Sequence, residues 1–228
     1  MNDEGFCSIA APYRLLKREY MWKLISGLVI VFSMTGSALA AEKTVTAYMQ
    51  DAAAASRRGD WNTARIIYSR LFTEERLAQS DPRFKAVLHY EYGRALGATC
   101  FFKEAEREFI SGNELDKNDG DKQTGGVFYL SLTQLGRLNL AQRKFPEAVS
   151  YFEKILGELD PVITANTAPS FYSNLLDDYA SALSGAGRSE EADVAEKRAT
   201  EIRTSVKTAP RTIVDPTPYG TQCVKKTD

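Results

Sequence analysis

The stretch Phe102-Lys103-Glu104-Ala105, with Phe109 one helical turn later, returns as Phe145-Pro146-Glu147-Ala148 with Phe152. A related stretch precedes them and a looser one follows: Trp61-Asn62-Thr63-Ala64 with Tyr68, and Ser189-Glu190-Glu191-Ala192 with Glu196. The steps between the four anchoring alanines are roughly 41, 43 and 44 residues. Periods of this size are typical of helical-hairpin arrays. The sequence therefore predicts an all-α solenoid, and such arrays usually serve as binding surfaces.

Apolar residues three and four positions apart predict helices almost throughout from Ala41 onward. Asp60 and the pair Asp81-Pro82 suit helix starts, and Gly185-Ala186-Gly187 suits a helix end. We expect a loop at 160–166, and a solvated turn rather than a calcium site at 117–122, which lacks the required ligand alternation. The predicted hairpins pair 44–58 with 60–77, 82–98 with 101–115, 126–141 with 145–159, and 169–184 with 189–206.

Within the first helices, His89, Tyr92-Gly93 and Leu96 are matched later by Leu132 and Leu135-Gly136. With the alanine and aromatic positions of the second helices, this pattern resembles the tetratricopeptide repeat (TPR) family. The resemblance implies a right-handed α-solenoid of about four TPR-like hairpins with an irregular C-terminal tail, in which Gly93, Gly136 and Ala180 permit close helix packing. The period exceeds the family's usual 34 residues, which implies longer helices. Other two-helix arrays remain the structural alternative.

The N-terminus carries a second signal. Lys23 precedes the apolar run 24–32, and Ala38-Leu39-Ala40 follows. A basic flank, a short apolar stretch and an A-x-A ending predict a secretory signal peptide over 1–40, cleaved after Ala40. The run is short for a bilayer-spanning helix, so a retained anchor is the alternative. The first twenty residues fit the signal poorly, and translation is expected to begin at Met21.

The predicted domains are this leader, a repeat domain over 41–206 and a proline-containing tail over 207–228. Without Cys7 of the leader, the exported chain keeps two cysteines, Cys100 in a hairpin turn and Cys223 in the tail. In an oxidising compartment they can form a disulfide that tethers the tail over the middle of the solenoid. The alternative is a buried Cys100 and an unpaired Cys223.

Composition removes several classes of function. The 228 residues carry 29 basic and 30 acidic side chains, a formal net charge of −1, so no field of one sign attracts nucleic acid or anionic lipid. His89 is the only histidine and is expected to pack at the core boundary. No metal, phosphate-loop or nucleophile motif is present in the sequence. We expect no catalytic, cofactor-binding or metal-binding residues, and an enzyme ranks third among the functions considered.

The register of the first helices predicts which side chains face the groove. They are Tyr90, Arg94, Thr133, Arg137, Asn174 and Asp177, together with flanking Met49, Ala53, Ser56, Ala141 and Ser181. Arg94 and Arg137 occupy equivalent places in neighbouring hairpins, where two guanidinium groups would hold a carboxylate of a peptide partner. The alternative is that both arginines pair with Glu91 or Asp177 inside the fold, or simply face water.

The predicted function is an exported adaptor that binds a peptide or protein in its concave groove. The alternative is a structural module of a cell-envelope complex that self-associates through its end helices. The chain contains no N-x-[ST] sequon, which favours a bacterial periplasm.

Overall fold

The computed structural model describes residues 44–73, 75–78, 80–117, 126–205 and 217–224. The predicted leader and most of the predicted tail lie outside these ranges, and residues 41–228 form one compact unit. The helices are α1 Val45–Arg57, α2 Trp61–Leu71, α3 Glu75–Ala78, α4 Pro82–Ala98, α5 Phe102–Lys117, α6 Val127–Ala141, α7 Phe145–Glu158, α8 Pro161–Thr167, α9 Pro169–Gly185 and α10 Ser189–Ser205.

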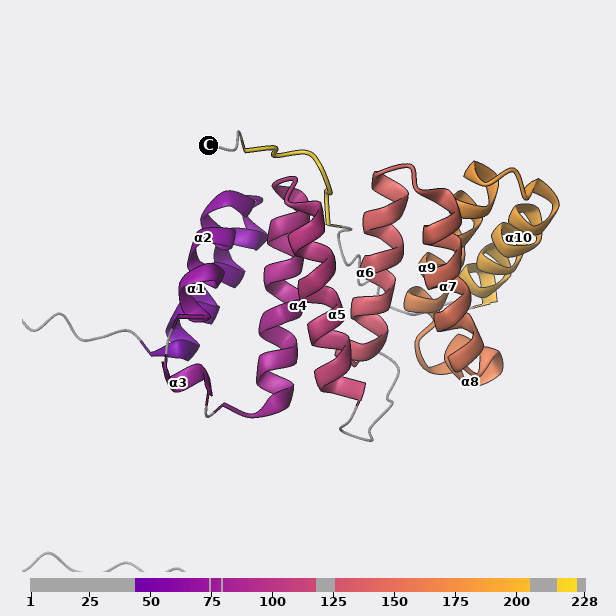
Figure 1. The fold of residues 1–228 in the computed structure, drawn as a ribbon. Helices are drawn as coiled ribbons and strands as arrows, with labels where there is room; N and C mark the ends of the chain where they lie inside the picture. The colour runs from indigo at the N-terminus through magenta and orange to yellow at the C-terminus, as the bar shows by residue number, and fades with distance from the viewer. Residues whose placement is uncertain (1–43, 74, 79, 118–125, 206–216, 225–228) are drawn as a thin grey trace, which may run out of the picture. The chain divides into compact units, whose positions relative to one another are not determined.

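Four hairpins follow one another along the chain (Figure 1). Within them α1 packs on α2, α4 on α5, α6 on α7 and α9 on α10. Each second helix then contacts the first helix of the next hairpin, and the first helices also contact one another in order. Each hairpin alone has too little core, so this stacking supplies its buried face. The prediction of a TPR-like solenoid is confirmed.

Local sequence explains where the helices begin. The Asp60 carboxylate accepts a hydrogen bond from the backbone N–H of Thr63, and the Asp81 carboxylate accepts one from Arg83. Both caps confirm the sequence prediction, and α4 has the predicted bounds. Removing such a cap typically costs about 1 kcal/mol.

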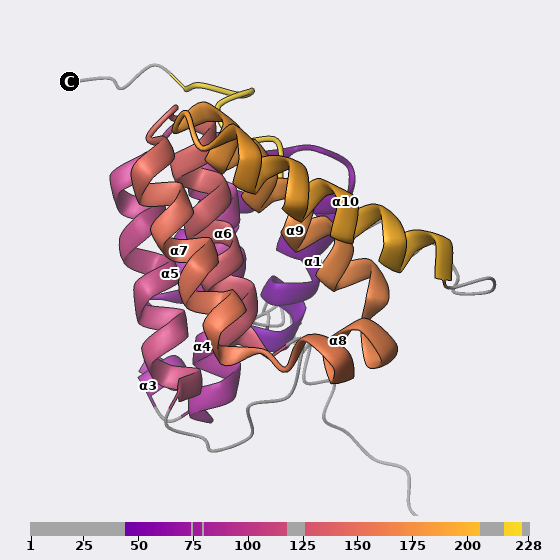
Figure 2. The ribbon, with the colours of Figure 1, turned by 90° about the vertical axis from the view of Figure 1, so that its right-hand side faces the viewer.

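The connection 160–166, predicted to be a loop, is the helix α8 (Figure 2). Asp160 accepts from the N–H groups of Val162 and Ile163, and Pro161 occupies the first helical position, so the local signals start a helix there. The prediction of longer helices is wrong for the first repeat, where α1 and α2 have only 13 and 11 residues. Much of the long period lies instead in the connections between hairpins.

Glycines on the first helices receive large rings from the second helices. A methyl group at Gly136 would lie 2.5 Å from the Phe152 ring, and one at Gly93 would lie 2.8 Å from the Phe109 ring. Both phenylalanines are fully buried. The predicted packing role of these two glycines is therefore confirmed.

The four hairpin turns share one backbone feature. Each has a residue with positive φ at the same place: Gly59 at 77°, Cys100 at 70°, Arg143 at 60° and Gly187 at 79°. The left-handed conformation is easy for glycine and strained for residues with a Cβ. Cys100 and Arg143 therefore occupy positions that favour glycine.

Arg143→Gly is expected to stabilise the protein by roughly 0.5–1 kcal/mol, because the exposed Arg143 sits in the left-handed conformation. Urea unfolding would measure the change. Lys144→Gly is the matched control, since Lys144 has φ −87° and no side-chain capping bond. Glycine is tolerated at this helix N-cap, so the control should change the stability little, and an equal response of both variants would contradict the assignment.

Candidate peptide-binding site

The centre of the predicted groove face is built by α4 and α6. Tyr90 and Gln134 are nearly buried, and the Gln134 amide donates to the Tyr90 hydroxyl at 3.4 Å. Arg94 lies one helical turn after Tyr90. Its guanidinium pairs with Glu91 at 3.0 Å and stands over the rings of Tyr90 and Trp61. The face therefore combines aromatic surfaces with oriented donors.

The two predicted arginines are both engaged within the fold. Arg137 pairs with Asp178 at 2.5 Å, which links α6 to α9. Burial raises the pKa of Asp178, and the charge of Arg137 opposes that rise. Asp177 pairs with Arg203 of α10 instead. Arg94 thus pairs with Glu91, as the alternative interpretation predicted. Arg137 pairs with Asp178, where that interpretation named Asp177.

The other predicted groove residues fall in different environments. Thr133 is 3% exposed and donates to the carbonyl of Tyr129, so it faces the core. Its neighbour Gln134 takes the place on the groove face, and the sequence analysis missed it. Asn174 is exposed on α9, one helical turn before Asp178. A shift of one residue turns a helical side chain by about 100°, which explains the exchange of Thr133 for Gln134.

A segment from the end of the chain occupies the face between α4 and α6. Residues Pro218 to Thr221 form a β-turn, in which the Thr221 N–H donates to the Pro218 carbonyl at 3.3 Å. Gly220 at its third position has φ 74°, as type II turns require. Tyr219 at the second position points into the site. Its hydroxyl donates to the Gln134 side-chain carbonyl at 2.6 Å.

The Tyr219 ring contacts three helices. It lies against Gly97 of α4, where a methyl group would come within 2.5 Å of two ring carbons. It meets Phe109 of α5 edge-on, with ring centroids 6.5 Å apart. Leu138 of α6 closes the same space. Burial raises the pKa of Tyr219 well above its ordinary value of 10, so the hydroxyl stays protonated and donates.

Polar contacts on both sides of Tyr219 fix the segment. Thr217 is buried, and its hydroxyl accepts from Arg94 Nε at 2.8 Å. From the turn onward, the N–H groups of Gly220 and Gln222 donate to the carbonyls of Gly97 and Ala98. These carbonyls lie in the last turn of α4, where no N–H four residues further along the helix is available to them. The segment therefore caps α4, and Figure 1 shows it in yellow beside that end of the helix.

A disulfide joins Cys223 to Cys100, which are 123 positions apart in sequence, with their Cα atoms 4.9 Å apart. Cys100 is half-buried in the turn between α4 and α5, and Cys223 is exposed. The segment also reaches the first hairpin, where the Gln222 amide donates to the Gly59 carbonyl at 2.7 Å. The tail thus bridges two hairpin turns.

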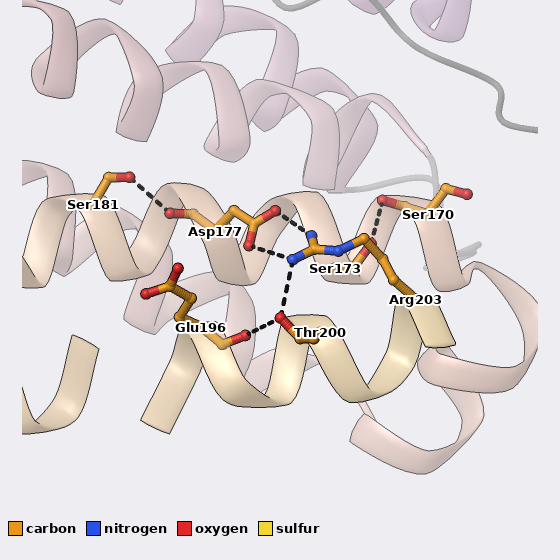
Figure 3. Close-up of polar contacts among 7 residues, drawn as sticks. All are labelled: Ser170, Ser173, Asp177, Ser181, Glu196, Thr200 and Arg203. Atoms are coloured by element: carbon orange, nitrogen blue, oxygen red, sulfur yellow. Dashed lines mark hydrogen bonds and ion pairs between the residues drawn. The ribbon is translucent and has the colours of Figure 1, made fainter. Parts of the chain in front are cut away.

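The fourth hairpin presents a polar face (Figure 3). The hydroxyls of Ser173, Ser181 and Thr200 donate to carbonyls of their own helices. The side-chain link between the helices in Figure 3 is the pair of Asp177 with Arg203, whose guanidinium also reaches the Thr200 hydroxyl. Ser173 is buried, whereas Ser181 and Thr200 are exposed and their contacts describe a solvated surface more than a prepared site.

The described residues contain no group of three or more His, Cys, Asp or Glu side chains placed to hold a metal ion. His89 packs its ring on Phe72 and lies 2.7 Å from Glu108 through Nδ1. This is the boundary position expected for it. Among the helices in the described ranges, none has the length and apolar character needed to cross a membrane.

Fold and site together define a TPR-like helical-repeat protein whose first-helix face already carries a polypeptide segment. BtubC from P. vanneervenii is similar, with a TM-score of 0.61 and 20% identity over 73% of this chain and 67% of BtubC. A putative kinesin light chain of Podosopora anserina with nearly identical TPR-like repeats gives 0.56 and 16% identity over 72% and 77%. MamA gives 0.55 and 17% over 73% and 82%. No family model and no curated protein matches the sequence.

Proposed function

We propose that this chain is an exported interaction module that holds a partner polypeptide on the face formed by its first helices. The supporting observation is that the segment Thr217–Val224 lies between α4 and α6. The inserted ring of Tyr219 and backbone hydrogen bonds hold the segment there. Repeat arrays bind extended partners through such faces. The role is binding rather than catalysis, because the polar side chains on this face hold one another and the tail.

Apart from the tail segment, the residues of the proposed binding face include several that the sequence predicted. Tyr90, Arg94 and Arg137 border the seated segment or its hydrogen-bonded neighbours, and Asn174 and Asp177 extend the face along α9. A partner carboxylate would have to compete with Glu91 and Asp178 for the two arginines. We therefore favour recognition through rings and amides over recognition of a charged chain end.

The proposed compartment is the bacterial periplasm. It is supported by the signal peptide predicted over 1–40, and by the disulfide, because such cross-links persist in oxidising compartments. The mature chain would then consist of the repeat domain over 41–206 and the tail over 207–228.

A second candidate function is self-association through the surface around α8 and α10. Three large apolar side chains are exposed there: Val162 at 65%, Ile163 at 59% and Val194 at 70%. Contiguous exposed apolar patches are a common basis for assembly. An assembly module would form oligomers that depend on protein concentration.

Site-specific photo-crosslinking in the native envelope separates these functions. A photoreactive residue would replace Asn174 on the proposed face, Ser150 on the exposed surface of α7, or Val194 on α10. A groove adaptor should give a discrete partner from position 174 and none from position 150. Crosslinks from position 194 to a second copy, with none from 174, would move the function to assembly. Charge reversal of Arg94 or Arg137 is a poorer test, since it would leave Glu91 or Asp178 beside a like charge.

A further inference from the structure

We propose that the space between α4 and α6 is a recognition site for a tyrosine presented on a tight turn of a partner polypeptide. The chain's own tail fills this site while the disulfide between Cys100 and Cys223 is intact. This inference rests on the proposed binding function and names the ligand chemistry and the control of the same site.

The site is specific for a tyrosine in shape and in polarity. Gly97 leaves the room that the ring fills, and a methyl group there would overlap it. At the inner end, the Gln134 carbonyl accepts from the Tyr219 hydroxyl while its amide donates to Tyr90. A phenylalanine ring would leave the Gln134 carbonyl without that donor, and unpaired buried polar groups are costly.

The seated segment defines the rest of the ligand. Glycine after the tyrosine favours the turn that puts the ring at its corner, because the third position needs a positive φ, and proline before the tyrosine favours an extended residue ahead of it. A small hydroxyl residue two positions earlier reaches Arg94, as Thr217 does. The chain after the glycine lies along the end of α4 through backbone contacts, which do not depend on side-chain identity. A partner therefore needs a Thr-Pro-Tyr-Gly-like turn and little else.

The disulfide controls access because it fixes the tail beside its site. A dithiol reductant can attack the exposed Cys223 sulfur, form a mixed disulfide with it, and then close its own disulfide. The two electrons pass to the protein, Cys100 and Cys223 become thiols, and the dithiol is oxidised. The freed tail still competes as a tethered ligand, at an effective concentration of about millimolar order. A partner must bind more strongly than the freed tail does, and the competition from the tail is stronger in the oxidised protein, where the disulfide holds the tail at its site.

The test uses the full mature chain carrying Y219A and C223S, whose tail has lost its anchor and its cross-link. The probe is a fluorescent peptide with the sequence of residues 217–224 and serine in place of the cysteine. Fluorescence anisotropy should show saturable binding with a Kd below about 1 mM. Oxidised wild type should bind the same peptide at least about tenfold more weakly, and a dithiol should recover part of the difference.

Matched variants examine the site itself. Adding Gly97→Ala to the receptor should abolish peptide binding, whereas Gly157→Ala should not, because a methyl group at Gly157 meets no atom within 4 Å. Circular dichroism would verify that both variants remain folded. A peptide with alanine at the tyrosine position should not bind. Equal affinities of the tyrosine peptide and the alanine peptide would overturn the proposal. So would an unchanged peptide affinity in the Gly97→Ala variant.

Failure here is distinguishable from failure of the proposed function. If the Y219A/C223S variant does not bind the peptide while position 174 still crosslinks to a partner, the tyrosine site is overturned and the adaptor function stands. If the peptide binds and position 174 gives no partner, the envelope function fails instead. If reduced wild type dimerises and does not bind the peptide, the tail is exchanged between two copies of the chain. That result would overturn the proposed site for a partner tyrosine.

Discussion

C223S is expected to lower the free energy of unfolding by about 2–4 kcal/mol, the largest effect we predict for a single side chain outside the core. The native cross-link joins residues 123 positions apart, so its loss gives the unfolded chain much more freedom. Urea unfolding of wild type and C223S under oxidising conditions measures the difference. The denaturant dependence should also steepen, because an unfolded chain without the cross-link exposes more surface.

Reduction supplies the control for this prediction. A dithiol should bring wild type to the stability of C223S and leave C223S unchanged, since no cross-link remains to be broken. An unfolding free energy equal in oxidised wild type and C223S would contradict the prediction, and would mean that the tail's tether does not constrain the array.

Phe152→Ala is expected to cost about 3–5 kcal/mol. The ring is fully buried and fills the space above Gly136, so its removal leaves a cavity between α6 and α7 in the larger core of the array. Thermal or urea unfolding measures the loss.

A double-mutant cycle with Gly136→Ala tests the contact itself. In wild type the added methyl group would lie 2.5 Å from the Phe152 ring, and overpacking of this kind costs about 1–3 kcal/mol. In the Phe152→Ala background the same methyl group has room, and alanine favours the helix over glycine by about 1 kcal/mol. Gly136→Ala should therefore change from destabilising to stabilising. The same sign in both backgrounds would contradict the assigned contact.

The sequence predicted the helical hairpins because their signals are local. Caps at Asp60 and Asp81 and the small residues at helix contacts act within a few positions of themselves, and the structure confirms them. The sequence-based prediction was wrong at α8, where Asp160 and Pro161 carry a signal for a helix start but were interpreted as a helix end.

The site was less accessible to sequence reasoning. The periodic pattern located the groove face to within one residue, which is enough to confuse Thr133 with Gln134. The partners of Arg94 and Arg137 depend on how neighbouring helices are rotated, which no local signal specifies. Tyr219 was missed because residues 217–224 have no helical period, although the turn residues Pro218 and Gly220 beside Cys223 could have pointed to it.

The tail segment that caps α4 is near one end of the sequence but lies in the middle of the folded array. By sequence, residues 217–224 are near the end of the chain, yet they complete a helix in the interior of the array and supply a ring to its centre. The middle of the array is therefore completed only when residues 217–224 have been synthesised and docked on α4. Deleting residues 217–224 would act first on the second and third hairpins, which they contact, and not on the fourth.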